Sequence, residues 1–175
     1  MGITCVGKST VGRLLGERLG YRFFNLDLEI KDFFSNTLAN IYYDCNRLEI
    51  DKTKALVLED VLLRCEKDSV IAISPIYYWE TYERLLDEYE VFCIELRDKA
   101  KHIAKRLVFT DENDVAVPND KRKRCYFRNL RSIKRIMDDY SYAHRYIETK
   151  VDIDGRSALE AAIEIEDIIQ SKSTD

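Results

Sequence analysis

Residues 2–9, Gly-Ile-Thr-Cys-Val-Gly-Lys-Ser, constrain the fold of this chain more than any other stretch. They match G-x-x-x-x-G-K-[ST] at every fixed position, and the glycines allow the tight turn in which successive backbone N–H groups converge on phosphate oxygens. Apolar residues follow at helical spacing from Val11 to Leu19, so the positive end of a helix points at the same place. The pattern predicts a phosphate-binding loop that opens a helix. The alternative is a glycine-bearing helix cap followed by an ordinary lysine.

The side chains of this loop have separate expected roles. Lys8 would neutralise the β- and γ-phosphates of ATP, and the Ser9 hydroxyl would bind Mg²⁺. The thiol of Cys5 is close to Lys8 and a helix N-terminus, which favours the thiolate, although phosphoryl transfer on such a loop needs no protein nucleophile. The residues expected to hold the nucleotide are Gly2, Cys5, Val6, Gly7, Lys8, Ser9 and Thr10.

A loop of this kind normally follows a buried apolar strand, whereas here the sequence begins at the loop itself. That strand usually lies in the middle of a parallel sheet, so without it both neighbouring strands keep unpaired backbone groups. We therefore expect the first, central strand to be missing and the given sequence to be truncated at its N-terminus.

Helix and strand patterns alternate along the rest of the chain. The run Val70-Ile71-Ala72-Ile73 is typical of a strand buried on both faces of a parallel sheet. Strands separated by helices imply βαβ crossovers, so we expect a three-layer α/β/α fold in a single domain over residues 1–175. Expected strands cover 21–26, 70–73, 91–96 and 150–153; expected helices cover 9–19, 27–34, 38–43, 47–65, 78–89, 99–107, a long segment ending near 147, and 157–170.

The composition argues against several other classes of protein. A net charge of −4 is unlike that of a protein that coats nucleic acid. The five cysteines form no C-x-x-C pair and lie at no metal-ligand spacing from a histidine, so we expect reduced thiols. No apolar run is long enough to span a bilayer, and no secretory pattern is present. We expect a cytoplasmic monomer that binds neither nucleic acid nor a membrane.

Three stretches of the chain match a longer pattern: residues 7–15 read Gly-Lys-Ser-Thr-Val-Gly-Arg-Leu-Leu, 23–27 Phe-Phe-Asn-Leu-Asp, and 38–42 Leu-Ala-Asn-Ile-Tyr. They resemble the G-K-S-T-x-G-R-x-L, F-x-D-x-D and I-x-x-I-F segments of the shikimate kinases, which have a P-loop kinase fold like that of the nucleoside monophosphate kinases. The resemblance implies a magnesium-dependent transfer of the γ-phosphoryl group of ATP to a hydroxyl of a small metabolite. Shikimate is the leading candidate, which would place the chain in aromatic amino acid biosynthesis. Asp27 keeps the acid that orients or deprotonates the attacking hydroxyl.

The chain departs from the family pattern on the acceptor side. Asn25 replaces the first acid of F-x-D-x-D, and no arginine occurs in Glu49-Ile50-Asp51-Lys52, where the family reads E-x-x-F-R. Ser74-Pro75-Ile76 replaces a G-G-G loop, and Pro75 removes a backbone donor. For the later substrate-binding arginine, Arg135 and Arg145 are both candidates by position, so they join Asp27 as expected substrate-binding residues.

The polar segment at residues 109–128 corresponds to the family's mobile lid. By resemblance, Arg122 or Arg124 would fold over ATP and stabilise the charge that develops on the transferred group. The run could instead be a solvated basic turn or, less simply, a patch for RNA phosphates.

Two other functions remain open from sequence. Asn25 and the changed loop at 74–76 are compatible with a nucleotide-binding paralogue that has lost catalysis. Tyr77, Tyr78 and Trp79 could hold a base in a nucleoside or nucleotide kinase, although packing in the core or at its rim is the commoner role of such rings.

Overall fold

The computed structural model describes residues 1–65, 67–108, 113, 115 and 126–172. At its centre lie two pairs of parallel strands: β1 (Arg22–Asn25) beside β2 (Ser69–Ala72), and β3 (Ile94–Arg97) beside β4 (Thr149–Asp152). The register places Phe24 opposite Ile71 in the first pair and Leu96 opposite Val151 in the second.

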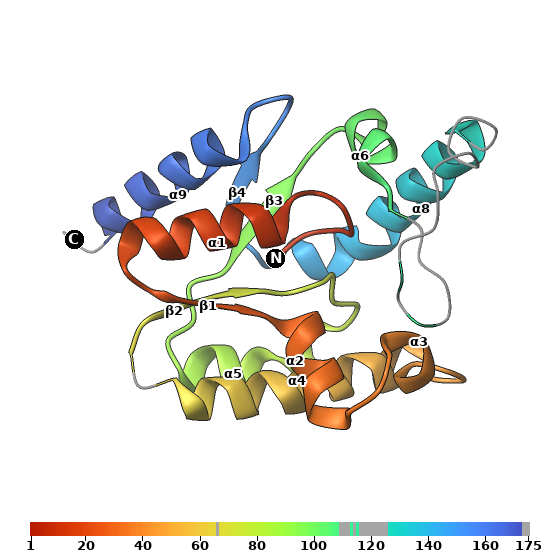
Figure 1. The fold of residues 1–175 in the computed structure, drawn as a ribbon, viewed down its shortest axis with the longest axis horizontal. Helices are drawn as coiled ribbons and strands as arrows, with labels where there is room; N and C mark the ends of the chain where they lie inside the picture. The colour runs from red at the N-terminus through yellow and green to blue at the C-terminus, as the bar shows by residue number, and fades with distance from the viewer. Residues whose placement is uncertain (66, 109–112, 114, 116–125, 173–175) are drawn as a thin grey trace.

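Helices cover both sides of these strands (Figure 1). α1 (Lys8–Leu19) and α9 (Ala158–Lys172) pack against each other on one side, while α2 (Leu26–Phe34), α4 (Arg47–Arg64) and α5 (Glu83–Glu88) lie on the other. The remaining elements are α3 (Leu38–Ile41), a 3-10 helix η1 (Trp79–Thr81), α6 (Ala100–Arg106) and α8 (Tyr126–His144). The arrangement confirms the predicted α/β fold with parallel strands and helices on both faces.

Close packing joins α1 to β1. A Cβ atom on Gly12 would lie only 2.7 Å from the ring of Phe23, so only a residue without a side chain allows this approach. Val11 and Leu15 are buried in the same contact region, and Gly20 ends the helix in a left-handed conformation with φ of 70°. The helix that begins at Lys8 is therefore fixed against the strand that ends at Asn25.

Some element boundaries differ from the sequence expectation. The helix expected over 78–89 is divided into η1 and α5, because the amides of Thr81 and Tyr82 bond carbonyls three residues back in a tighter turn. The strand expected over 91–96 pairs with β4 only from Ile94 onward. At α9 the expected capping box is present, since Ser157 and Glu160 bond each other's backbone amides.

Within the described residues β2 pairs only with β1, and β3 only with β4, so the strands form two pairs and not one sheet. No helix in the described ranges is both long and apolar enough to cross a membrane.

Candidate active site

The loop at residues 2–7 curves tightly beside β3 before α1 begins. Its amide at Val6 donates to the carbonyl of Ile3 at 3.2 Å. A Cβ atom on Gly2 would lie 2.6 Å from the carbonyl oxygen of Leu96, so the loop can approach β3 this closely only with glycine there. Gly7, with φ of 117°, gives the N-cap of α1. No side chain caps this helix end and no acidic residue lies in its first turn, which suits an anionic ligand.

Lys8 lies at the mouth of the loop. Its ammonium donates a hydrogen bond to the carbonyl of Ile3 at 3.0 Å. Burial lowers the pKa of Lys8 to about 8, while the charges of Asp27 and Cys5 act in the opposite direction. A bound phosphate would replace the carbonyl partner and add negative charge beside this buried cation.

Ser9 is tied to the strand that follows α1. The side-chain amide of Asn25 donates to the Ser9 hydroxyl oxygen at 2.9 Å, and its carbonyl oxygen accepts from the backbone N–H of Asp27 at 3.0 Å. Both ends of Asn25 are therefore used, one to cap α2 and one to hold the hydroxyl expected to bind Mg²⁺. A carboxylate at this position could cap the helix equally well and would also face the metal.

Asp27 lies half-buried in the first turn of α2, within electrostatic range of Lys8 and Lys54. Burial raises the pKa of the nearby Tyr42, and the negative charges of Asp27 and Asp51 raise it further. In the described structure the buried Tyr42 hydroxyl has no hydrogen-bond partner. Asp27 thus faces cations able to balance its charge and a phenol available to a ligand.

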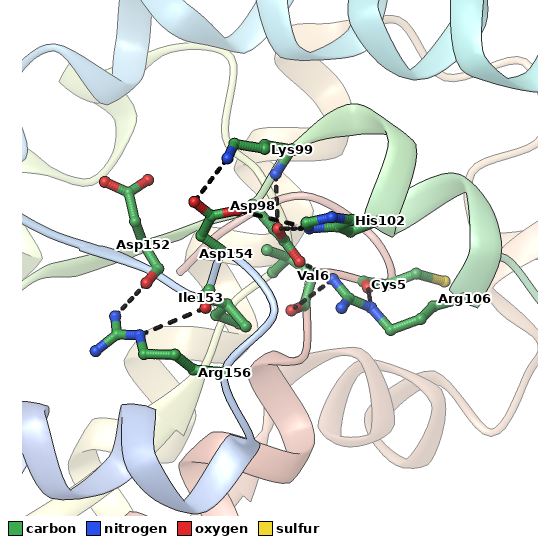
Figure 2. A network of polar contacts seen from close by, with 10 residues as sticks. All are labelled: Cys5, Val6, Asp98, Lys99, His102, Arg106, Asp152, Ile153, Asp154 and Arg156. Carbon is green, nitrogen blue, oxygen red and sulfur yellow. Dashed lines mark hydrogen bonds and ion pairs between the residues drawn. The ribbon is translucent and has the colours of Figure 1, made fainter.

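A polar network holds the outer side of the loop (Figure 2). Arg106 on α6 donates to the carbonyl of Cys5 at 3.1 Å and to the carboxylate of Asp98 at 2.5 Å. Asp98 is 5% exposed, and its other oxygen contacts His102 at 2.8 Å. The side chains of Asp98, His102 and Asp154 lie close enough to suggest a metal site. Because Arg106 and Lys99 already neutralise the two carboxylates, we interpret the group as an ion-pair network.

Comparison with known proteins gives a direct result. A sequence model of shikimate kinase matches residues 4–165. This chain belongs to the shikimate kinase family. Shikimate kinase from Bacillus licheniformis is 23% identical over 166 residues, which span 93% of this chain and 86% of that protein.

Solved structures share the fold of the family. Shikimate kinase from Acinetobacter baumannii in complex with shikimate superposes with a TM-score of 0.70 at 19% identity, over 99% of this chain and 92% of that one. The YorR protein of Bacillus subtilis, in complex with phosphorylated GDP, gives a TM-score of 0.63 at 14% identity over 100% and 96%. The chain has the P-loop kinase fold, and at these identities the fold does not determine the acceptor.

The shikimate kinase family's arginine segment is replaced here by a buried charge pair. Asp51 is fully buried and accepts hydrogen bonds from the backbone amides of Tyr77 and Tyr78 at 2.7 and 2.8 Å. Lys54, 4% exposed, donates to the carbonyl of Pro75 at 2.7 Å and lies 3.9 Å from Asp51. These two residues of α4 hold the segment that replaces G-G-G, and sequence reasoning did not single out either of them as functional.

The two arginines expected to bind the substrate are both exposed on the surface of the molecule. Arg145 lies over the rings of Tyr142 and Tyr146, 3.9 and 4.7 Å from their centres. The described contacts bring neither Arg135 nor Arg145 to Asp27. Arg47, which the sequence did not single out, lies 4.6 Å above the ring of Tyr77 and pairs with Asp139 at 2.9 Å.

Of the three aromatic residues that could hold a base, Tyr77 and Trp79 pack on other rings. Tyr77 lies 4.5 Å from Tyr140, and Trp79 stacks on Tyr146 at 5.7 Å between ring centres. These contacts favour packing over base binding. The lid arginines Arg122 and Arg124 lie outside the described residues, as does most of the expected lid at 109–128.

Neither histidine is simply an exposed surface residue, because each contacts a carboxylate. His144, at the end of α8, is 4% exposed and contacts Glu95 of β3 at 2.8 Å. His102 is half-buried against Asp98, as described above. The signal available in the sequence was the spacing of His102 and Arg106, which places both on one face of a helix, and the position of Asp98 directly after the preceding strand.

Proposed function

We propose that this chain is an ATP- and Mg²⁺-dependent kinase that phosphorylates a hydroxyl of a small metabolite, with shikimate the leading candidate. We propose that it works as a cytoplasmic monomer. The observation that supports this most is the uncapped N-terminus of α1, with Lys8 beside it and Asp27 within electrostatic range of Lys8. Bound Mg·ATP would supply the transferable phosphoryl group.

The residues of the chain have distinct roles in this proposal. Amides of the loop and the N-terminus of α1 would bind the phosphates, and Lys8 would balance their charge. Ser9 would ligate Mg²⁺. Asp27 would orient the acceptor hydroxyl and accept its proton as the bond to phosphorus forms. Lys54 would add a second positive charge near Asp27.

The test is an assay of ADP release with shikimate and with a panel of polyols, on wild type and on Asp27→Asn. We expect turnover on one acceptor, a loss of about 10² to 10⁴ in kcat for Asp27→Asn, and unchanged ATP affinity by calorimetry. Lys8→Met should weaken ATP binding itself. Equal background rates of ADP release with every acceptor would contradict the proposed catalytic activity.

A nucleotide-binding protein without catalysis is the second candidate, favoured by Asn25, both ends of which are already bonded. It predicts calorimetric ATP binding with no turnover on any acceptor. A nucleotide kinase, in contrast, would be stabilised against heat by nucleoside monophosphates and not by shikimate.

A further inference from the structure

Three charged residues lie in a row on one face of α4. Arg47, Asp51 and Lys54 follow one another at helical spacing, so their side chains project from the same side of the helix. Asp51 and Lys54 are buried, whereas Arg47, at the first position of the helix, is exposed. Lys54, at the buried end of the row, lies within electrostatic range of Asp27. Arg47 therefore forms the solvent end of a charged row that leads to the residue proposed to accept the proton.

The segment after β2 lies against this face of α4. Because β1 and β2 are parallel and end in register, Asp27, just after β1, and residues 73–78, after β2, leave the strands at one edge. Tyr77 of this segment is fixed from two directions. Its amide donates to Asp51 at 2.7 Å, and its ring lies 4.5 Å from the ring of Tyr140 on α8. The ring of Tyr77 is thus a rigid platform on the proposed acceptor side.

Arg47 is held over this ring by one stacking contact and one ion pair. Its guanidinium lies 4.6 Å from the centre of the Tyr77 ring, and its Nη2 donates to the carboxylate of Asp139 on α8 at 2.9 Å. Stacking fixes the plane of a guanidinium and leaves its edge able to form two parallel hydrogen bonds to an anionic group. The pair with Asp139 uses one carboxylate oxygen, and the two side chains are 49% and 32% exposed. Exposed pairs of this kind contribute little to stability, so another anion can take the place of Asp139.

We propose that Arg47 binds an anionic group of the phosphoryl acceptor, and that Asp139 occupies the place of this group in the acceptor-free protein. The anionic group is a carboxylate or a phosphate, because both match the planar fork of a guanidinium. The inference rests on the proposed kinase activity and names its acceptor class, a molecule with a hydroxyl for Asp27 and an anionic oxygen group for Arg47. The Arg47–Asp139 pair, which joins α4 to α8, opens when the acceptor binds.

Two matched pairs of compounds separate the charge of the acceptor from its shape. Shikimate is compared with its methyl ester, and adenosine monophosphate with adenosine, by calorimetry on protein loaded with a non-hydrolysable ATP analogue. For whichever charged compound binds, Arg47→Gln should raise the Kd roughly 10- to 100-fold, as expected for lost hydrogen bonds to a charged group. The Kd of its uncharged counterpart and that of the ATP analogue should stay unchanged. Arg47→Lys, which keeps the charge without the fork, should give an intermediate Kd.

Asp139→Asn should have the opposite effect. Removal of the internal competitor should lower the Kd of the charged compound by up to about fivefold, whereas loss of a merely structural ion pair would leave the Kd unchanged or raise it. Arg64→Gln is the matched control, because Arg64 lies at the other end of α4, is 46% exposed and also forms ion pairs. This control should leave every Kd unchanged. Thermal unfolding of each variant shows that it is folded.

Three results would overturn the proposal. They are an equal effect of Arg47→Gln on the charged and uncharged compounds, a Kd that Asp139→Asn leaves unchanged or raises, and the failure of both charged compounds to bind to wild type and to Asp139→Asn. ADP release is measured separately on the same proteins. Binding that depends on Arg47 without ADP release would refute the kinase activity and leave the anion site standing. ADP release that is indifferent to Arg47 would do the reverse.

Discussion

Cys5 has φ of 62°, in the left-handed region that glycine adopts at little cost. For other residues this conformation costs about 1–2 kcal/mol, and a β-branched residue there is a stronger outlier. We predict that Cys5→Gly leaves the free energy of unfolding unchanged or raises it by up to about 1 kcal/mol, since relief of strain exceeds the added chain entropy. Cys5→Val should lower it by about 1 kcal/mol or more. Urea unfolding of both variants measures the free energy of unfolding, and equal effects of Cys5→Gly and Cys5→Val would contradict the prediction.

Asn25 offers a second test at a single residue. Asn25→Asp would keep the cap on α2, since Asp and Asn cap helices about equally, and would place a carboxylate next to the Ser9 hydroxyl. We predict a roughly tenfold gain in ATP affinity with Mg²⁺ present, about 1.4 kcal/mol, and no gain in EDTA. Asn25→Ser is the matched control, because it retains a cap without a carboxylate. Calorimetry of the three proteins with Mg²⁺ and in EDTA measures their ATP affinities. An equal gain in affinity for Asn25→Asp without metal would contradict the prediction that residue 25 faces the metal.

Between elements, Asp98 links the end of β3 to α6 and, through Arg106, to the phosphate loop. Burial alone would raise the pKa of Asp98, but hydrogen bonds from Arg106 and His102 outweigh it and lower the pKa below its usual value. The resulting stabilisation is fully present above about pH 4, the pKa in the unfolded chain, and is lost as the pH falls through the lower folded value.

Asp98→Asn should therefore destabilise the protein by about 2 kcal/mol at pH 7, because Arg106 loses its charged partner. The difference from wild type should shrink at pH 3, because the carboxyl of the unfolded wild-type chain is then mostly protonated while the folded form, with its lowered pKa, resists protonation. Asp152→Asn removes an exposed pair with Arg97 and should cost no more than about 0.5 kcal/mol. Chemical denaturation at both pH values measures all three proteins, and a difference that stays constant with pH would refute the ionic role of Asp98.

The loop at residues 2–9 and the charged pair on α4 differ in how well the sequence predicts their roles. Residues 2–9 could be read directly, because the geometry of that loop depends on local backbone conformation and residue type. The roles of Asp51 and Lys54 could not, since their partners are backbone groups of the segment after β2 and their burial depends on which face of α4 packs inward. The burial of His144 against Glu95 depends in the same way on which face of α8 packs inward.

At the scale of the whole molecule, two apolar cores lie on either side of the unjoined strand pairs. One is built around α1, β3, β4 and α9, and the other around α2, α4 and α5. Val70 packs against the first core, whereas Ile71 packs against the second, so β2 contacts both. A cavity lined by β2 and β3 therefore lies between the two cores, and Met1, just before the loop, also lines it.

The amino group of Met1 makes this junction sensitive to pH. Burial and the positive charge of Lys8 lower its pKa from 8.0 to about 6, while Cys93 and Glu95 act in the opposite direction. A cation with a lowered pKa binds fewer protons in the folded state, so the free energy of unfolding should rise between pH 6 and pH 8, by about 2 kcal/mol from this group. The rise expected from Lys8 falls above pH 8, outside this window.

N-terminal acetylation isolates the contribution of Met1. It removes the charge but keeps an N–H that can donate to Ile94. Urea unfolding at pH 6 and pH 8 should show a smaller increase in stability for the acetylated protein, with the two forms closest at pH 8. Mass spectrometry confirms that Met1 is retained. If both forms gain the same stability between these pH values, the amino group of Met1 is not buried beside β3 with a lowered pKa.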